Sequence, residues 1–152
     1  MSLRGFAASL TRVSGNVRTF PINFQVPAAS DLMPQFARSR FDHIGLVTHD
    51  VKPDESWVEA TRVWVTSPRA HPYNIEWLRF EPDSPVVGPL RTEPHVAYRV
   101  DDVRSAIQGH EVLAEPFQPA PDPSFLTVAF VLIDGAVIEF MEYGDPNEEG
   151  WF

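Results

Sequence analysis

The last long apolar run of the chain constrains its fold more than any other stretch. Residues 125–143 read FLTVAFVLIDGAVIEFMEY, two β-rich segments on either side of Asp134-Gly135. An Asp-Gly dipeptide between such segments is typical of a tight type I′ hairpin turn. The second segment contains Glu139, a carboxylate that is unfavourable to bury in a strand unless a partner offsets its desolvation. Glu139 is therefore either an acid on a solvated face or, in the sharper interpretation, a cation ligand on a face that lines a cavity.

Similar segments recur upstream, which indicates an internal duplication. Residues 138–143 (IEFMEY) repeat the pattern of residues 75–80 (IEWLRF), in which Ile-Glu is followed by aromatic, aliphatic, charged and aromatic side chains. Residues 41–50 (FDHIGLVTHD) parallel residues 93–102 (EPHVAYRVDD), with a histidine at the same place, then strand-forming residues and then Asp. The chain therefore holds two related strand-led units, each with one His near its start and one Glu near its end.

The matched positions form a candidate metal site. They are His43 and Glu76 in the first unit and His95 and Glu139 in the second. Two imidazole nitrogens and two carboxylate oxygens suit one divalent ion, Ni, Co, Mn, Fe(II), Zn or Mg, with water completing its coordination. Two units related by a pseudo-twofold axis would bring the four side chains together. The small residues Gly45 and Ala97 share the faces of the two histidines and leave space beside them.

Composition narrows the classes of protein that fit. A chain of 152 residues with 43% hydrophobic residues is long enough for one domain with its own core. The absence of cysteine excludes disulfides and thiolate zinc sites, and no apolar run is long enough to span a bilayer. The net charge of −9 disfavours nucleic acid and anionic membrane surfaces as partners. We expect a cytoplasmic protein that acts on a small molecule.

The first 40 residues differ from the rest of the chain. They hold five Arg and one Asp, a charge of +4, against −13 for residues 41–152. This composition resembles a transit peptide, but residues 20–26 alternate apolar and polar side chains as a half-buried strand does. Pro21 would confine such a strand to a sheet edge or a bulge. We therefore expect residues 1–40 to be an N-terminal extension with one strand at 20–26, followed by a single domain, residues 41–152.

The two units predict a mixed α+β domain with unequal halves. The first unit covers residues 41–81 and the second residues 93–143, joined by a proline-rich linker. We predict strands at 41–48, 59–66, 73–80, 95–100 and 111–117 and in both arms of the final hairpin, with a short helix from Asp101 or Asp102 to Gln108. His and Glu stand 44 residues apart in the second unit but 33 in the first, which indicates that the first unit lacks a helix or a strand.

These motifs resemble the vicinal oxygen chelate superfamily. The segments DHIGLV, NIEWL, PHVAYRVDD and VIEFME carry the resemblance, which covers residues 41–143. The superfamily includes glyoxalase I, methylmalonyl-CoA epimerase, extradiol dioxygenases, fosfomycin-resistance enzymes and bleomycin-binding proteins. The resemblance implies a glyoxalase-like fold, in which paired βαβββ modules form a curved sheet around a metal, here with a shortened first module. It implies a homodimer, and it implies that the metal ligands are His43, Glu76, His95 and Glu139.

The ligand set favours one chemistry within the superfamily. The order His-Glu-His-Glu resembles glyoxalase I most closely and implies a lyase or isomerase that removes a proton next to a metal-chelated carbonyl. Glu139 and Glu76 are the candidate bases. Glu59 is a further candidate, although a solvated acid is its simpler interpretation, and Arg99 and Arg62 could meet an anionic group of the substrate. The alternatives are a non-catalytic binding protein of the bleomycin-resistance type and a dioxygenase with a reduced ligand set.

Overall fold

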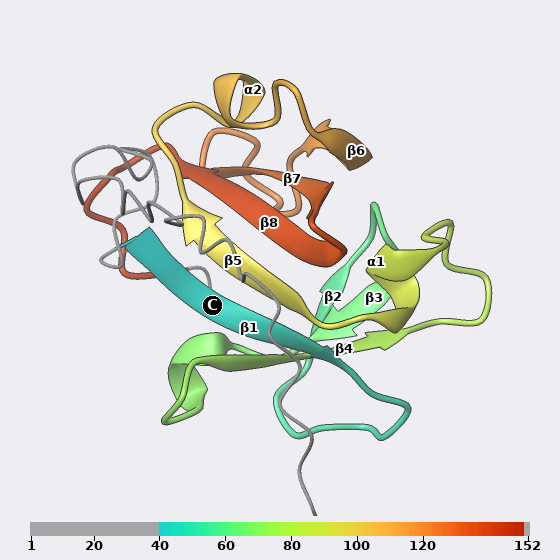
Figure 1. Cartoon of the computed structure of the whole chain (residues 1–152). Coiled ribbons are helices and arrows are strands. Elements are labelled where there is room, and N and C mark those ends of the chain that lie inside the picture. Colours follow the sequence, from blue (N-terminus) through green and yellow to red (C-terminus); the bar gives the residue numbers. More distant parts are fainter. Residues whose placement is uncertain (1–39, 151–152) are drawn as a thin grey trace, which may run out of the picture. The chain divides into compact units, whose positions relative to one another are not determined.

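The computed structural model describes residues 40–150, all within one unit of the chain, Met33–Phe152. In these residues one mixed, eight-stranded sheet has the order β2-β3-β4-β1-β5-β8-β7-β6 and curls toward one side (Figure 1). The strands are β1 (Phe41–Val47), β2 (Ser56–Val58), β3 (Val63–Val65), β4 (Ile75–Phe80), β5 (His95–Arg99), β6 (Glu111–Phe117), β7 (Leu126–Ile133) and β8 (Ala136–Tyr143). The short helices η2 (Pro68–Ala70), α1 (Pro89–Thr92) and α2 (Val103–Ala106) lie in the connections. The strand predicted at 20–26 lies outside the described residues.

The final hairpin forms as the sequence predicts. Strands β7 and β8 pair antiparallel along their whole length, from Leu126 opposite Tyr143 to Ile133 opposite Ala136. Asp134 and Gly135 have φ values of 50° and 83°. Positive φ at both central residues is the signature of a type I′ turn. The hairpin prediction is therefore confirmed, and it fixes which residues of β8 face the concave side of the sheet.

Strand register brings the matched positions of the two units to the middle of the sheet. Strands β1 and β5 are antiparallel neighbours, and Gly45 of β1 lies opposite His95 of β5. Strand β1 also pairs in parallel with β4, where Gly45 is opposite Glu76. In the same way β5 pairs in parallel with β8, where Ala97 is opposite Glu139. In both cases the small residue two positions after the histidine pairs with the glutamate.

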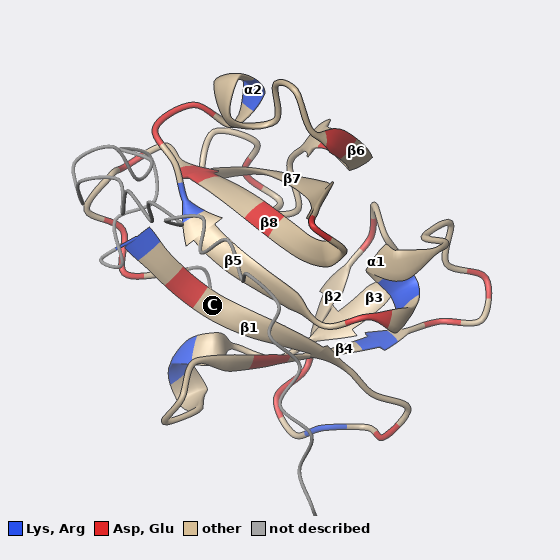
Figure 2. Ribbon diagram, viewed as in Figure 1, with Lys and Arg blue, Asp and Glu red and all other residues tan. Residues whose placement is uncertain are grey.

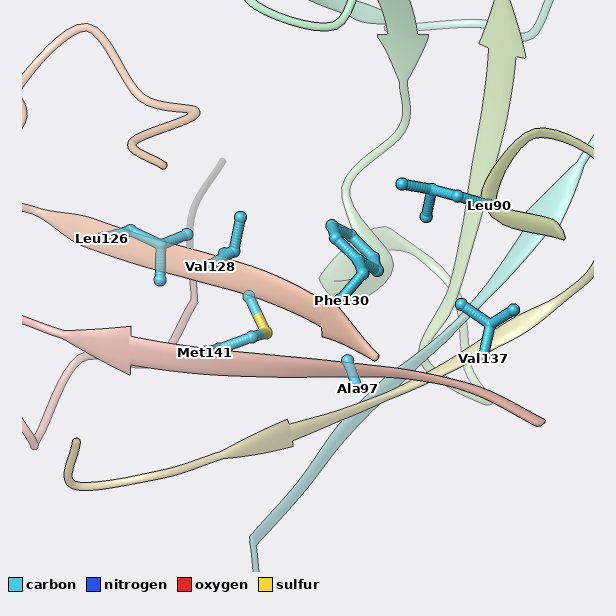
Figure 3. Packing of buried hydrophobic residues seen from close by; sticks show 7 residues of the cluster. All are labelled: Leu90, Ala97, Leu126, Val128, Phe130, Val137 and Met141. Carbon is cyan, nitrogen blue, oxygen red and sulfur yellow. The ribbon is translucent and has the colours of Figure 1, made fainter. Parts of the chain in front are cut away.

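Three clusters of buried apolar side chains hold the sheet. One lies on the concave side and joins α1 to β5, β7 and β8 (Figure 3), one lies beneath α2 on the opposite face, and one lies in β2–β4. Their buried members are Leu90, Ala97, Leu126, Val128, Phe130, Val137 and Met141; then Val103, Ala106, Ala129, Val131 and Phe140; then Val58, Val63, Val65 and Leu78. Strand β8 contributes to the first two clusters, so both of its faces are covered and an acid within it needs a partner.

The first half of the sheet departs from the prediction in two ways. The strand expected at 59–66 is confirmed only over Val63–Val65, because β2 ends at Val58, β3 begins at Val63, and a turn between them places Arg62 at a φ of 49°. Strand β2 itself begins at Ser56, inside the stretch expected to connect the first strand to the next. The first half therefore has four strands, and what it lacks between β1 and β2 is a helix.

The helix predicted after β5 is shorter than expected, because α2 ends at Ala106 and not at Gln108. Helix α2 begins after Asp102, whose side chain accepts a hydrogen bond from the Ser105 amide at 3.1 Å, so the predicted cap is present. The linker between the units also contains α1, which follows Gly88 at a φ of 66° and begins with Pro89. No helix in residues 40–150 is both long enough and apolar enough to cross a membrane.

Candidate metal centre

Four side chains from four neighbouring strands meet on the concave side of the sheet. His43 of β1 and His95 of β5 place their Nε2 atoms 3.3 Å apart. Oε2 of Glu76, on β4, lies 3.4 Å from the first of these nitrogens and 3.7 Å from the second. Oε2 of Glu139, on β8, lies 3.3 Å and 3.1 Å from the same two atoms. The structure thus brings together all four of the side chains that the repeated pattern singles out, and all four are buried.

The spacing of these atoms fits a single divalent ion. Donor atoms about 2.1 Å from an ion lie roughly 3.0 Å apart at neighbouring octahedral positions and roughly 3.4 Å apart at tetrahedral ones. The nitrogen–nitrogen and nitrogen–oxygen separations here run from 3.1 to 3.7 Å. The donor atoms of His43, Glu76 and His95 all lie within 4.8 Å of one another. These residues could hold a metal ion, and their mixed nitrogen and oxygen donors match the borderline divalent metals.

The charges of the buried side chains in this centre favour a bound cation. Burial alone would raise the pKa of Glu139, but hydrogen bonds from His43 and His95 and their charges lower it to about 2. Burial alone would lower the pKa of His43, yet Glu76, Asp42 and Glu139 together raise it well above its ordinary value. The carboxylates around His43 thus favour a proton on its imidazole. A divalent cation would replace that proton.

Asp42 orients the first histidine from behind. Its Oδ1 accepts the Nδ1 hydrogen of His43 at 2.9 Å, which leaves Nε2 free to bind a metal. Arg69 reaches the same Oδ1 at 2.6 Å, and Arg99 donates to Oδ2 at 2.7 Å. Burial raises the pKa of Asp42, but His43 and the two arginines outweigh burial and lower it. Asp42 therefore remains a carboxylate, although it is only 2% exposed.

An irregularity in the sheet allows the consecutive residues Asp42 and His43 to be buried together. The register between β1 and β5 shifts between Phe41 and Ile44, so Asp42 and His43 are both buried although they are consecutive. In a regular strand, consecutive side chains point to opposite faces. A shift of this kind re-aims side chains and is common next to functional sites. Figure 2 shows an acidic segment near the start of β1 and another in the middle of β8.

The second histidine depends on a glycine. A Cβ placed on Gly45 would lie 2.0 Å from Cε1 and 2.3 Å from Nε2 of His95, so the imidazole ring occupies the space that a side chain would need. The ring of Phe130 meets the ring of His95 edge-on, with centroids 5.3 Å apart. The sequence predicted free space beside the histidines, and the His95 ring fills the space at Gly45.

An apolar pocket opens above the two glutamates. It encloses about 490 Å³ of empty space, its open mouth included. Strands β2, β3 and β4 line one side, and β7, α1 and the end of β6 line the other. The lining residues are Val58, Thr61, Val63, Val65, Glu76, Leu78, Phe80, Val86, Leu90, Phe117, Pro119, Val128, Phe130 and Glu139. The two carboxylates are therefore the ionisable groups that a bound molecule would meet.

Three further predicted residues lie away from this pocket lining. Arg62 pairs with Asp83 at 2.9 Å on the surface. Arg99 shares the strand of His95, but its guanidinium binds Asp42 and the carbonyl of Glu148. Glu59 accepts a hydrogen bond from Trp57 at 2.6 Å and is exposed. The geometry gives Arg99 a part in the centre through Asp42, and it gives Arg62 and Glu59 surface contacts.

Asp42 and Arg69 are functional candidates that the sequence reasoning missed. A histidine that binds metal usually donates its other ring hydrogen to a carboxylate or a carbonyl. The acid immediately before His43 was therefore an available signal in the sequence. No comparable signal pointed to Arg69, which follows η2's first residue and reaches Asp42 across 27 positions of the chain.

Comparison with known proteins adds information on the fold alone. The crystal structure of hypothetical protein BH1468 from Bacillus halodurans C-125 resembles this chain with a TM-score of 0.53 and 20% sequence identity. The likeness covers 72% of this chain and 97% of that one. No protein-family model matches the chain, and no curated protein is significantly similar to it. The chain and this neighbour share a curled mixed sheet.

Proposed function

We propose that the protein is a metal-dependent lyase or isomerase of the glyoxalase-like class. The observation that carries the proposal is the meeting of two imidazoles and two carboxylates at the closed end of an apolar pocket. Strand order supports paired modules as well, because β2-β3-β4-β1 and β5-β8-β7-β6 are the same arrangement in reverse. In this interpretation β1–β4 form a module without its helix, and β5–β8 form a complete one. A homodimer, a cytoplasmic location and the division at residue 40 remain predictions.

The chain's own residues suit removal of a proton next to a carbonyl. A divalent ion held by the four ligands would supply a Lewis acid that polarises vicinal oxygens of a substrate. Glu139 is ionised and lines the pocket, so it can accept a proton from a carbon atom above it. Glu76 lines the same floor and is the second candidate base. Asp42 keeps His43 in one orientation and one tautomer while the proton moves.

Solvent exchange tests this proposal directly. Purified protein is first analysed for bound metal, then incubated in D₂O with small α-hydroxycarbonyl compounds, and deuterium at the α-carbon is followed by NMR. Glu139→Gln should lower the exchange rate by about 10²–10⁴-fold, the range that a general base contributes. Glu111→Gln, an exposed acid in β6, is the matched control and should exchange at the wild-type rate. Oxygen uptake coupled to substrate loss would contradict the proposal in favour of a dioxygenase, and tight binding without exchange would favour a binding protein.

A further inference from the structure

We propose that the part of the substrate beyond its chelating oxygens is a small, uncharged, apolar chain or ring. This inference rests on the proposed function, because the two glutamates and the two histidines mark the end of the pocket where the oxygens would lie. It goes further because it concerns the walls, which the metal chemistry does not determine. It also replaces the anionic substrate group that Arg62 and Arg99 led us to expect from the sequence.

The walls of the pocket are apolar on both sides. Strands β2, β3 and β7 contain no charged residue at all (Figure 2). Val58 and Val63 face the pocket from one side, and Val128 and Phe130 face it from the other. Leu90 of α1 closes the same space, and Figure 3 shows it pointing toward Phe130. A methylene group that moves from water into such a pocket is stabilised by about 0.8 kcal/mol.

The cations near the pocket are already engaged. Of the residues that the structure describes, none with a positive charge lines the pocket. Arg91, at the end of α1, donates to the backbone carbonyls of Glu81, Ser84 and Val86 at 3.0 to 3.3 Å. Arg62, at the surface, is bound to Asp83. An anionic tail would therefore lose its hydration without gaining a partner, and it would lie near two carboxylates.

A bound metal would not reverse this preference. The charges of Glu76 and Glu139 balance those of one divalent ion. Arg69 and Arg99 together carry one positive charge more than Asp42 balances, but both are bound to Asp42 and neither lines the pocket. No unpaired positive charge then faces the pocket to attract a second anionic group. Near the metal ligands, Phe117 and Phe130 stack with centroids 6.5 Å apart and an angle of 22°. Flat apolar surface at this place suits an aromatic ring or a short alkyl chain.

Hydroxamates, which chelate a metal through two adjacent oxygens, test the inference in the metal-loaded protein. Calorimetry compares acetohydroxamate with its propyl, butyl and pentyl homologues, with benzohydroxamate, and with the monohydroxamate of succinic acid. We expect affinity to rise by up to about fourfold for each buried methylene. The acidic tail should bind at least tenfold more weakly than an alkyl tail of similar length. Equal affinity along the series, or a preference for the acidic tail, would overturn the inference.

A pair of variants locates the effect. Phe117→Ala removes a wall residue and should reduce the gain per methylene and the affinity for benzohydroxamate more than the affinity for acetohydroxamate. Phe125→Ala is the control, because Phe125 packs against Tyr143 with centroids 5.8 Å apart and does not line the pocket. An equal loss in both variants would contradict the assignment of the tail to this pocket.

Failure of the proposed function can be told apart from failure of this inference. If acetohydroxamate does not bind after metal loading, the metal chemistry is wrong. The apolar pocket is then judged by itself, from a toluene titration of the metal-free protein followed by methyl NMR. Shifts confined to Val58, Val63, Leu90 and Val128 would support the inference, whereas unchanged methyl signals up to the solubility of toluene would overturn it.

Discussion

One methyl group added at Gly45 should disable the metal centre while leaving all four ligands in the sequence. The new Cβ would lie 2.0 Å from Cε1, 2.3 Å from Nε2 and 2.5 Å from Nδ1 of His95. Gly45 is not among the glycines of positive φ, so its backbone suits alanine and the conflict is with the imidazole ring. In an open strand, Gly→Ala usually stabilises a protein slightly. A loss of stability would therefore report the steric conflict.

The size of the effect follows from the displacement required. The ring must retreat by about 1.4 Å to reach an ordinary carbon contact of about 3.4 Å, whereas a metal ligand tolerates a shift of only about 0.2 Å. Glu139, 3.1 Å away, and the Phe130 ring limit where the His95 ring can go. We expect metal affinity to fall by at least about a hundredfold. Overpacking should lower the free energy of unfolding by about 1–3 kcal/mol.

Two measurements on one set of variants test whether a side chain at position 45 displaces the His95 ring. Calorimetry gives the metal affinity of Gly45→Ala, and urea unfolding with a chelator present gives its stability. In the double variant Gly45→Ala/His95→Ala, stability should recover because the steric conflict is gone, while metal binding stays weak. Metal affinity within threefold of wild type in Gly45→Ala would refute the reasoning, because the ring of His95 could then not be a ligand held against Gly45.

Three further predictions concern charge. Asp42→Asn should weaken metal binding about 10- to 100-fold in equilibrium dialysis, because an amide holds His43 less firmly and no longer matches two arginines; wild-type affinity would contradict this. Burial lowers the pKa of His43, but neighbouring carboxylates raise it well above its ordinary value, so metal binding should release a proton and tighten as pH rises toward that pKa. Calorimetry in buffers of different ionisation enthalpy measures the release. A hydrogen bond from Arg79 lowers the pKa of Glu55, so their pair stabilises the fold above the ordinary pKa and less as pH falls through the lowered one; Glu55→Gln should flatten this acid limb in urea unfolding.

The candidate ligands were predictable because they recur. A single Glu139 within a strand permits two interpretations, but the same pattern at Glu76 and a histidine at the same place in each unit favour one of them. Strand register then brings each glutamate next to a histidine-bearing strand, since Gly45 is opposite Glu76 and Ala97 is opposite Glu139. The hairpin was equally predictable, because an Asp-Gly turn depends only on residues that are close together in the sequence. Local patterns and repetition thus carried the prediction where the chain is regular.

What could not be predicted depends on breaks in that regularity. Alternation along β1 would place Asp42 outside, and only the register shift against β5 brings it in beside His43. Residues 63–65 (VWV) are strand-forming, and nothing in residues 59–62 announces a turn with Arg62 at positive φ. Arg99 was predicted to meet the substrate because strand alternation places it on the same face as His95. The residue that its guanidinium binds, Asp42, lies 57 positions away in the chain.

The two halves of the domain have cores of unequal size, which affects where the structure opens locally. The hairpin β7–β8 is covered on both faces, whereas β2–β4 rest on one small cluster, Val58, Val63, Val65 and Leu78. Local opening is easiest where few apolar contacts must be broken. Backbone amides of β2 and β3 should therefore exchange with solvent earlier than those of β7 and β8. The wall of the pocket formed by β7 should therefore be rigid, and the wall formed by β2 and β3 should be mobile. Molecules of different width would be accommodated by displacement of β2 and β3.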